Sequence, residues 1–470
     1  MYTENRPPND PANAGGSDLY GRVLHHALLP AWEKLVRKRP TLDHLASLMK
    51  SQWLPYDQLL ELQARELRAL IAHAYANTDY YRQLFDDAGL TPDDIAGPAD
   101  LARLPPLTRE RARASVEART SRAAPEVAIH KTTSGTLGQP LAFGYDLESE
   151  YRRNAVRMRG YAWAGYEVGA KSLHYWGFGT SEPTWARKAK ITLDRAIKRE
   201  SYFDCTSRSD AAMAEVVAAI QHKKPDVIVT YAQAGGDLAR HVLRTGQRSW
   251  GTIPVICGAE RLYPHDREAL EAAFGPAVFE TYGCREFMLM ATECEAHDGL
   301  HVQMENVIVE VVVTEGDRVC AAEPGEVGDV VVTDLHNFGM PFIRYANGDR
   351  AVARAPDTCA CGRQLARIDS IEGRVTETLR DGDGNPVSGL VFNVLFCDLA
   401  EATRQFQAVQ HRNGDITLKL VPAGELTDET LGHLTALCEK YLPGVDVATE
   451  ICDEIPLTPA SKRKVVVVEQ

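Results

Sequence analysis

The sequence predicts an α/β protein: a large N-terminal domain with parallel-sheet units and a strand-rich subdomain, and a small mobile C-terminal α+β domain. Two observations predict this fold. Between residues 172 and 281, β-branched strands alternate with amphipathic helical patterns, which is typical of a parallel sheet covered by helices. After a polar, glycine-rich stretch at Arg374–Asn385, about a hundred residues form a separate pattern of usual domain size. We therefore expect a flexible tail (1–17), a large domain (18–373) and a small lid domain (374–470).

Composition and charge exclude several classes of protein. The 470 residues are 44% hydrophobic and 25% charged, as in ordinary globular proteins, and the net charge of −13 argues against a general nucleic-acid binder. No apolar run is long enough to span a bilayer, and the polar start lacks the apolar centre of a signal peptide. Ten cysteines in a chain of this length do not indicate a disulfide framework. We expect a cytoplasmic protein without a nucleic-acid or membrane partner.

The first part of the large domain, residues 18 to about 120, has a helical pattern. Leucine and isoleucine recur at helical spacing from Tyr56 to Ala74, with charged residues between them. Asn77-Thr78-Asp79 interrupts this pattern, and a short helix follows that ends near Gly89.

The alternating region follows. We expect strands at Ser172–Phe178, Pro225–Tyr231, Ile253–Cys257 and Ala277–Thr281, and helices after Ser209-Asp210, at about Asp237–Thr245 and at Pro264–Phe274. Long runs of valine in His301–Val352 predict several strands, with glycine turns expected at Gly316, Gly325, Gly328 and Gly348. For the small domain, the sequence pattern predicts a helix (Gly389–Ala402), a strand pair around Phe406–Val421, a second helix (Thr427–Tyr441) and a last strand (Lys464–Glu469).

A short polar loop before the alternating region is the first candidate for chemistry. Residues 131–141 combine four hydroxyl side chains with two glycines, and successive backbone N–H groups in such a loop can bind an anion. The loop is not a Walker motif, because no Gly-Lys-Ser/Thr follows the glycines. Alone, it fits an ordinary turn before a strand equally well.

Four further stretches follow this loop in order: CGAE (257–260), ETYGCRE (280–286), ANGDRA (346–351) and PLTPASKRK (456–464). With TTSGTLGQP (132–140) they resemble the adenylate-forming superfamily of acyl-CoA synthetases, peptide-synthetase adenylation domains and luciferases. The pattern SQW…HAYANTDYYRQLF…LPPLT, the YGCRE form and a Cys-x-Cys-Gly-Arg element resemble, more narrowly, its phenylacetate–CoA ligase-like branch. The resemblance covers nearly the whole chain from about residue 45.

The resemblance implies that ATP and Mg²⁺ are used to convert a carboxylic acid, aryl or arylacetic, to an acyl-adenylate with release of pyrophosphate. Coenzyme A then accepts the acyl group as a thioester. Such chemistry needs donors on the phosphates and a cation where negative charge accumulates. The implied nucleotide-binding residues are Thr132, Thr133, Ser134, Gly135, Thr136 and Gly138 on the phosphates, Gly258, Ala259, Glu260, Tyr282 and Gly283 around the adenine, and Asp349 and Arg374 on the ribose.

Three residues are implied to act on the reacting groups: Lys462, Glu286 and Thr133. Lys462 matches a mobile lysine that bridges the substrate carboxylate and the α-phosphate, and Glu286 matches a magnesium ligand. The family has glycine where this chain has Ser461, so Arg463 and Lys464 remain alternatives to Lys462. By residue type alone, Lys462 would be a solvated charge near the chain end, Glu286 a surface carboxylate and Asp349 a turn residue.

The acceptor and the acid are less defined by the sequence. At the hinge the chain has Gly373-Arg374 followed by Val-Thr-Glu, whereas the superfamily commonly has Gly-Arg-x-Asp-Asp. An amine, another nitrogen nucleophile or a carrier-protein thiol is therefore an alternative acceptor to coenzyme A. The segments Tyr175–Phe178 and Tyr231–Gly236 correspond to regions that flank the acid, although we expect Trp176 to be a core aromatic. A non-catalytic nucleotide-binding protein is a third hypothesis, and a homodimer is a further expectation.

Three cysteines and a histidine suggest a structural metal. Cys294, Cys359 and Cys361, with one imidazole, make the donor set of a closed tetrahedral zinc site. The resemblance favours His301 as the fourth ligand, and His297 is the local alternative. Ordinary reduced cysteines are the other interpretation of this pattern.

Overall fold

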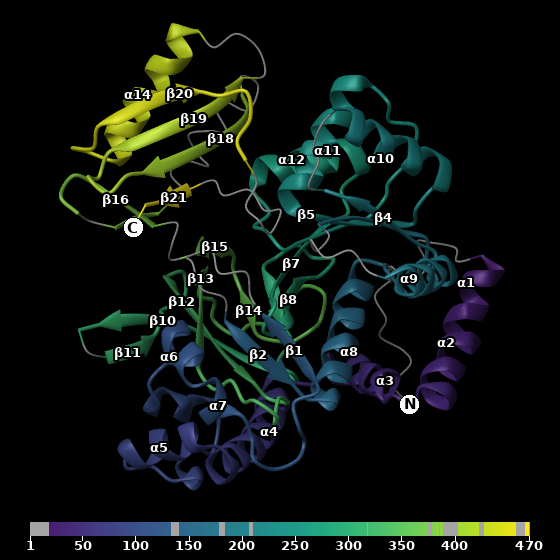
Figure 1. The fold of residues 1–470 in the computed structure, drawn as a ribbon, viewed down its shortest axis with the longest axis vertical. Coiled ribbons are helices and arrows are strands. Elements are labelled where there is room, and N and C mark those ends of the chain that lie inside the picture. The colour runs from purple at the N-terminus through teal and green to yellow at the C-terminus, as the bar shows by residue number, and fades with distance from the viewer. Residues whose placement is uncertain are drawn as a thin grey trace.

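The computed structural model describes residues 18–132, 141–177, 184–205, 210–316, 318–374, 378–384, 386–388, 403–422, 427–456 and 466–469. In Figure 1 the C-terminal segments form a sheet of their own, and Tyr263 from the preceding part of the chain packs into its apolar core. Among the described residues, no helix has the length and hydropathy needed to cross a bilayer.

An eight-stranded sheet forms the centre of the large part. Its order is β14-β9-β8-β7-β6-β5-β3-β4. The five strands from β4 to β7 are parallel, which confirms the predicted parallel sheet, and the other three are antiparallel. The bounds are β3 (Ser172–Trp176), β4 (Glu200–Asp204), β5 (Val227–Tyr231), β6 (Val255–Gly258), β7 (Val278–Cys284), β8 (Met288–Glu293), β9 (Leu300–Val302) and β14 (Arg367–Ile368).

Three helices cover one region of this sheet: α10 (Asp210–Lys223), α11 (Ala232–Thr245) and α12 (Pro264–Phe274). Their apolar side chains form a single core with those of β3, β5 and β6. The predicted bounds of α12 are confirmed, but α11 begins five residues earlier than predicted. The pair Gly235-Gly236 is typical of a loop, but both glycines lie in the helix. Glycine is needed at position 236 because a Cβ there would meet the Asp266 carboxylate on α12 at 2.0 Å.

Helix α8 (Leu147–Trp163) was not predicted. It has two buried arginines, Arg153 and Arg159, which interrupt the apolar pattern on which helix prediction depends. Arg153 pairs with Asp334, and Arg159 pairs with Glu305 at 2.5 Å. These carboxylates are far away in the sequence, so local patterns do not reveal that the arginines can be buried.

The strand-rich segment forms a five-stranded antiparallel sheet in the order β11-β10-β12-β13-β15. Turns at Gly316 and Gly325 have left-handed backbones, as predicted, whereas Gly328 lies inside β12 and the prediction of a turn there is wrong. Gly348 and Asp349 also lie within a strand, β13. The bounds are β10 (Val307–Glu315), β11 (Arg318–Ala321), β12 (Val327–Asp334), β13 (Tyr345–Val352) and β15 (Ile371–Arg374).

The N-terminal helical pattern is confirmed, and Thr78 caps the helix α5 at the predicted interruption. The segment contains α1 (Leu19–Val23), α2 (Leu29–Ala31), α3 (Thr41–Ser51), α4 (Tyr56–Asn77), α5 (Asp79–Asp87), α6 (Arg109–Ala114) and α7 (Val116–Arg119). Helices α4 and α5 form a core with β10 and the turn after β12. A short hairpin of β1 (Ile129–Thr132) and β2 (Ala142–Tyr145) follows.

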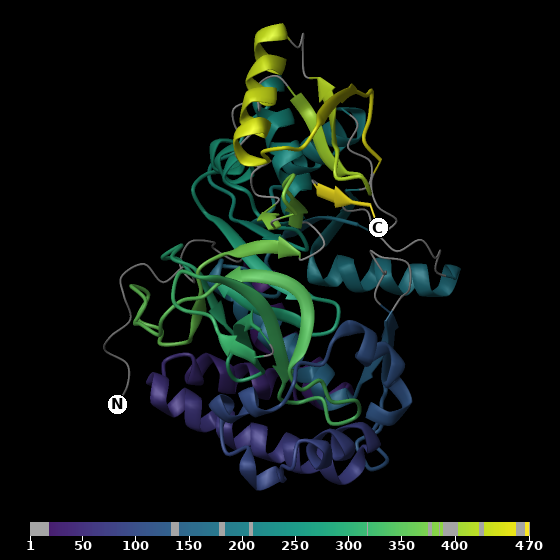
Figure 2. The same ribbon diagram turned by 90° about the vertical axis from the view of Figure 1, so that its left-hand side faces the viewer.

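The C-terminal segments form a four-stranded sheet, β20-β19-β18-β21, with helix α14 on one face (Figures 1 and 2). The predicted strand pair and second helix are confirmed, and the predicted helix 389–402 lies outside the described residues. The division between residues 373 and 374 stays a prediction. The bounds are β16 (Thr378–Arg380), β17 (Pro386–Ser388), β18 (Thr403–Gln410), β19 (Ile416–Pro422), α14 (Asp428–Tyr441), β20 (Val447–Ile451) and β21 (Val466–Val468).

Candidate active site and metal centre

The carboxyl ends of the parallel strands bring the first candidate residues together. The chain order reverses between β3 and β5, since β4 pairs with one side of β3 and β5 with the other. Ligands of open α/β sheets bind outside the carboxyl ends of the strands at such a reversal. Trp176 and Tyr231 end these two strands, and their rings meet edge to face at 4.5 Å between centroids. Trp176 is only half-buried, so our expectation of a core aromatic is partly wrong.

The predicted adenine-side residues lie at the ends of the next two strands. Gly258 ends β6, and a Cβ there would lie 2.8 Å from the Thr281 hydroxyl. Ala259 has a left-handed backbone (φ 64°), which turns the chain sharply. The turn directs the Glu260 carboxylate to the start of α11, where it accepts a hydrogen bond from the Gln233 backbone N–H at 3.2 Å. Glu260 therefore also has a structural role.

Tyr282, Asn347 and Asp349 form a hydrogen-bonded cluster between β7 and β13. The Tyr282 hydroxyl donates to Asp349 Oδ2 at 2.9 Å, and Asn347 Nδ2 donates to that hydroxyl at 2.8 Å and to Asp349 Oδ2 at 2.9 Å. Burial, and then the Asp349 charge, raise the pKa of Tyr282 well above its usual value, so the hydroxyl remains a donor. This cluster fixes the orientation of the Asp349 carboxylate.

The two residues implied to contact the ribose are neighbours in the five-stranded sheet. Asp349 on β13 and Arg374 on β15 are Cα partners in the antiparallel register. Opposed residues of such a pair have Cβ atoms about 5 Å apart. The fold therefore places these two sequence positions side by side, although 25 residues separate them in the chain.

Glu286 lies in the turn between β7 and β8, four residues beyond Tyr282. It is buried, and the Arg153 guanidinium donates to its backbone carbonyl. Its Oε1 lies 3.7 Å from Arg109 Nη1 and accepts a long hydrogen bond of 3.4 Å from the Tyr345 hydroxyl. Burial, and next the Glu286 charge, raise the pKa of Tyr345. The contacts of the Glu286 carboxylate with these described partners are thus long. Such a carboxylate can exchange them for a bound cation.

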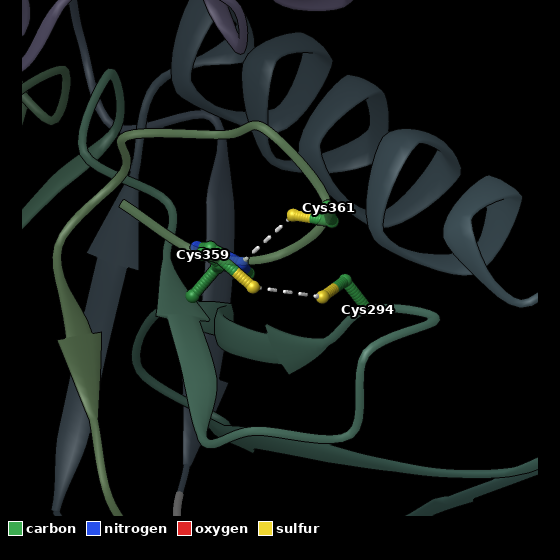
Figure 3. A group of neighbouring side chains, drawn as sticks. Cys294, Cys359 and Cys361 are labelled. Carbon is green, nitrogen blue, oxygen red and sulfur yellow. Dashed lines mark hydrogen bonds between the residues drawn. The ribbon is translucent and has the colours of Figure 1, made fainter. Parts of the chain in front are cut away.

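The candidate metal ligands form a closed, buried cluster. Ligand atoms of Cys294, His301, Cys359 and Cys361 all lie within 4.8 Å of one another. Figure 3 shows the three thiols pointing toward one another; Cys294 Sγ and Cys359 Sγ are 3.7 Å apart, and Cys361 Sγ is 3.5 Å from His301 Nε2. His301 Nδ1 faces the Leu365 carbonyl at 3.2 Å, so that its other nitrogen is directed to the sulfurs.

His297, the alternative fourth ligand, does not belong to this cluster. His297 is one-third exposed and faces Glu293, with Nδ1 3.4 Å from a carboxylate oxygen. Within the cluster, the hydrogen bond from the Cys294 thiol, and next that from His301, hold the pKa of Cys361 far below its usual value in spite of burial. A low thiol pKa provides the thiolate that a metal needs.

The chain resembles known enzymes over most of its length. No family model matches it. It is 27% identical to the phenylacetate-coenzyme A ligase of Thermus thermophilus over 77% of this chain and 80% of that protein. The ligases of the same name from Aromatoleum evansii and Escherichia coli are 29% and 28% identical, each over 69% of this chain and 72% of the relative. Among solved structures, 2-hydroxyisobutyryl-CoA ligase in the postadenylation state shares the fold, with a TM-score of 0.72 and 19% identity, over 90% of this chain and 92% of that one.

The chain is thus homologous to phenylacetate–CoA ligases over most of its length, at 27–29% identity, and shares the fold of an adenylate-forming CoA ligase. It is therefore a ligase of the AMP-forming type. The predicted family and fold class are confirmed.

Part of the predicted site of this adenylate-forming ligase lies outside the described residues: Thr133, Ser134, Gly135, Thr136, Gly138 and Lys462. Thr132 ends β1 and is paired with Ala142 on β2, so both ends of the phosphate-loop candidate are held by one hairpin. Asn337 Nδ2 donates to the Gly144 carbonyl at 3.0 Å and ties this hairpin to the turn after β12. Lys131 lies over the Tyr145 ring at 5.0 Å.

Sequence reasoning missed three residues that contact the predicted ones. Asn347 belongs to the quoted ANGDRA stretch, where only the aspartate was singled out, although an amide can bridge a hydroxyl and a carboxylate. Arg109 and Tyr345 come from separate segments, and their side chains meet each other and Glu286. For Arg109 we see no sequence signal, because it is one of three arginines in the short polar helix α6, and such side chains are usually solvated.

Proposed function

We propose that this ligase activates a carboxylic acid with ATP and transfers the acyl group to coenzyme A. The observation that carries the proposal is the Tyr282–Asn347–Asp349 cluster, which joins two of the sequence motifs at the carboxyl edge of the parallel sheet. The relatives named phenylacetate–CoA ligases support the same activity.

The first step joins the acid to AMP. A carboxylate oxygen attacks the α-phosphorus of ATP, and the bond between that phosphorus and the bridging oxygen of pyrophosphate breaks. The two Asp349 oxygens are suited to accept both ribose hydroxyls, and the Tyr282 and Asn347 donors hold the carboxylate in one orientation through Oδ2. Lys462 would neutralise charge on the α-phosphate, and the 132–138 loop would donate to the leaving phosphates.

Glu286 fits the role of magnesium ligand. Its carboxylate offers hard oxygen donors, and its contacts with Arg109 and Tyr345 are long enough to be exchanged. A bound Mg²⁺ would supply positive charge at the phosphates. In the apo protein, the Arg109 guanidinium provides part of the compensating charge for this carboxylate.

The second step forms the thioester. The thiolate of coenzyme A attacks the acyl carbon, and the bond from that carbon to the AMP oxygen breaks. We propose an aryl or arylacetic acid, because the relatives act on phenylacetate by name and because the edge-to-face Trp176–Tyr231 pair ends the strands at the ligand-binding edge.

We further propose a structural zinc at the Cys/His cluster. Three thiols and one imidazole within 4.8 Å provide the four ligands of a closed site. The zinc would join the segment between β8 and β9 to the Cys359–Cys361 loop, in addition to the short β9–β14 pairing and the Glu295–Arg363 ion pair at 2.9 Å. A homodimer and a cytoplasmic location stay predictions.

Pyrophosphate exchange tests the proposal. Wild-type protein should exchange labelled pyrophosphate into ATP only when a suitable acid, such as phenylacetate or benzoate, is present. Lys462→Ala should lower exchange by about a hundredfold or more while ATP binding is retained. Exchange without thioester formation when coenzyme A is added would assign the chain to the alternative class, with an amine, another nitrogen nucleophile or a carrier-protein thiol as acceptor. Absence of exchange with every acid would contradict the proposal.

A further inference from the structure

Helix α9 (Trp185–Lys198) is attached to the rest of the molecule by its polar side. Arg195 lies over the Tyr202 ring at 3.8 Å, and the helix buries none of its residues. Apart from Ile191, which is half-buried beside Arg195, its large apolar residues recur at helical spacing on the opposite side, which is the reverse of a normal surface helix. Trp185, Leu193 and Ile197 are 85%, 63% and 45% exposed. We name these three residues the α9 face.

A second exposed apolar element adjoins this helix. The N-terminal arm, Leu19–Val36, is a continuous helix in which only Gly21 and Leu24 are buried. The Tyr20 hydroxyl donates to the Ile197 carbonyl at 2.9 Å, and Arg199 pairs with Asp18 at 2.7 Å. These contacts join the arm to the C-terminal end of α9, and Figure 1 shows the two elements side by side. The arm exposes further large apolar side chains: Leu19, Leu28, Trp32, Leu35 and Val36.

The charge of these two elements is opposite to that of the chain. Residues 185–199 contain six Lys or Arg against Asp194, and residues 18–39 contain five against Asp18 and Glu33, in a chain of net charge −13. Lys188 and Lys190 are exposed and flank the apolar sector of α9 on its two sides. Apolar surface bordered by lysines, with tryptophans among it, is the pattern of a helix that lies in the headgroup region of a membrane.

Three other occupants fit less well. The segment 1–17 is polar and has almost no apolar side chain with which to cover the α9 face. A second copy would bring two basic faces together, because a two-fold interface pairs a surface with itself. Protein partners usually avoid lysine at their contacts, whereas anionic lipids attract it.

We propose that the α9 face and the N-terminal arm bind the surface of an anionic membrane. The apolar side chains enter the headgroup boundary, and the flanking cations lie at the level of the lipid phosphates. The protein is peripheral in this proposal, since none of the helices that the structure describes could span a bilayer. The proposal departs from our expectation of no membrane partner. The proposal is independent of the ligase chemistry, because neither element carries a proposed catalytic residue.

Co-sedimentation of the full chain with lipid vesicles tests the proposal. We expect binding to vesicles in which a third of the phosphatidylcholine is replaced by phosphatidylglycerol, and little binding to pure phosphatidylcholine or in high salt. Trp185→Ser with Leu193→Ser should abolish sedimentation, and Lys188→Glu with Lys190→Glu should weaken it by about tenfold or more. Leu243→Ser on α11, whose side chain is 45% exposed, is the matched control and should bind as wild type.

Unchanged thermal melting of the variants shows that folding is retained. Equal binding to neutral and anionic vesicles, or equal binding by the double serine variant and the Leu243→Ser control, would overturn the proposal. So would a wild-type dimer that the double serine variant converts to a monomer in light scattering. Binding to an acidic protein without binding to vesicles would have the same consequence.

Discussion

The Cys/His cluster and the Tyr282–Asn347–Asp349 cluster are built alike but are used differently. Each joins two segments about 65 residues apart in the chain, one from β7–β9 and one from the segment beyond β12. In the first, the donor atoms are directed at one another and enclose a centre. In the second, hydrogen bonds hold one carboxylate at the edge of the sheet. Similar long-range pairing can thus support either a closed centre or an open binding position.

The largest expected effect is at the closed centre. Cys359→Ser should remove one of four ligands, so that zinc is lost and the free energy of unfolding falls by about 4 kcal/mol. Metal content by mass spectrometry and thermal melting measure this. Cys320→Ser, at a half-buried thiol on β11, is the control. Equal zinc content in the two variants would show that the cluster holds no metal.

At the open position, the expected effect is on ATP rather than on folding. Asp349→Ala should lower kcat/KM for ATP in the exchange reaction by about a hundredfold, because two hydrogen bonds to the ribose are lost. The melting temperature should change little. Asp329→Ala on the neighbouring strand β12 is the control. A hundredfold loss in that control would mean that the sheet, and not the carboxylate, is responsible.

A smaller effect is expected from the residue that orients this carboxylate. Tyr282→Phe keeps the ring and removes the donor to Asp349, so kcat/KM for ATP should fall by about fivefold. When Asp349→Ala is already present, Tyr282→Phe should have almost no further effect, since its partner is gone. Additive losses in this double-mutant cycle would show that Tyr282 acts mainly through its ring.

The smallest effect concerns the pH dependence of stability at Glu280, two residues before Tyr282 on β7. Burial raises the pKa of Glu280 on β7 to about 7, although the Leu262 N–H donates to its carboxylate at 3.1 Å. The folded state therefore keeps a proton that the unfolded state loses, and stability falls as pH rises from about 4.5 to 7. Glu280→Gln should flatten this slope and be about 1 kcal/mol more stable at pH 8. Parallel slopes for wild type and variant in pH-dependent melts would contradict this.

The sequence was sufficient to predict an element where its local residue pattern agrees with which of its residues are buried. The β-branched run of β5 and the proline start of α12 were predicted because each element satisfies its own periodicity. It was insufficient for α8, because Arg153 can be buried only when Asp334 from a distant strand arrives. The site followed the same rule: Tyr282 and Asp349 came from motifs, whereas Arg109 depends on a tertiary contact.

The tight packing of α11 on α12 limits how the acid preference of this ligase can be re-engineered. Gly236 has no room for a methyl group beside Asp266, which is itself fixed by Arg240 at 2.9 Å. A Cβ on Gly235 would likewise meet the Thr230 side chain at 2.6 Å. Libraries that diversify the segment after β5 should therefore hold both glycines constant.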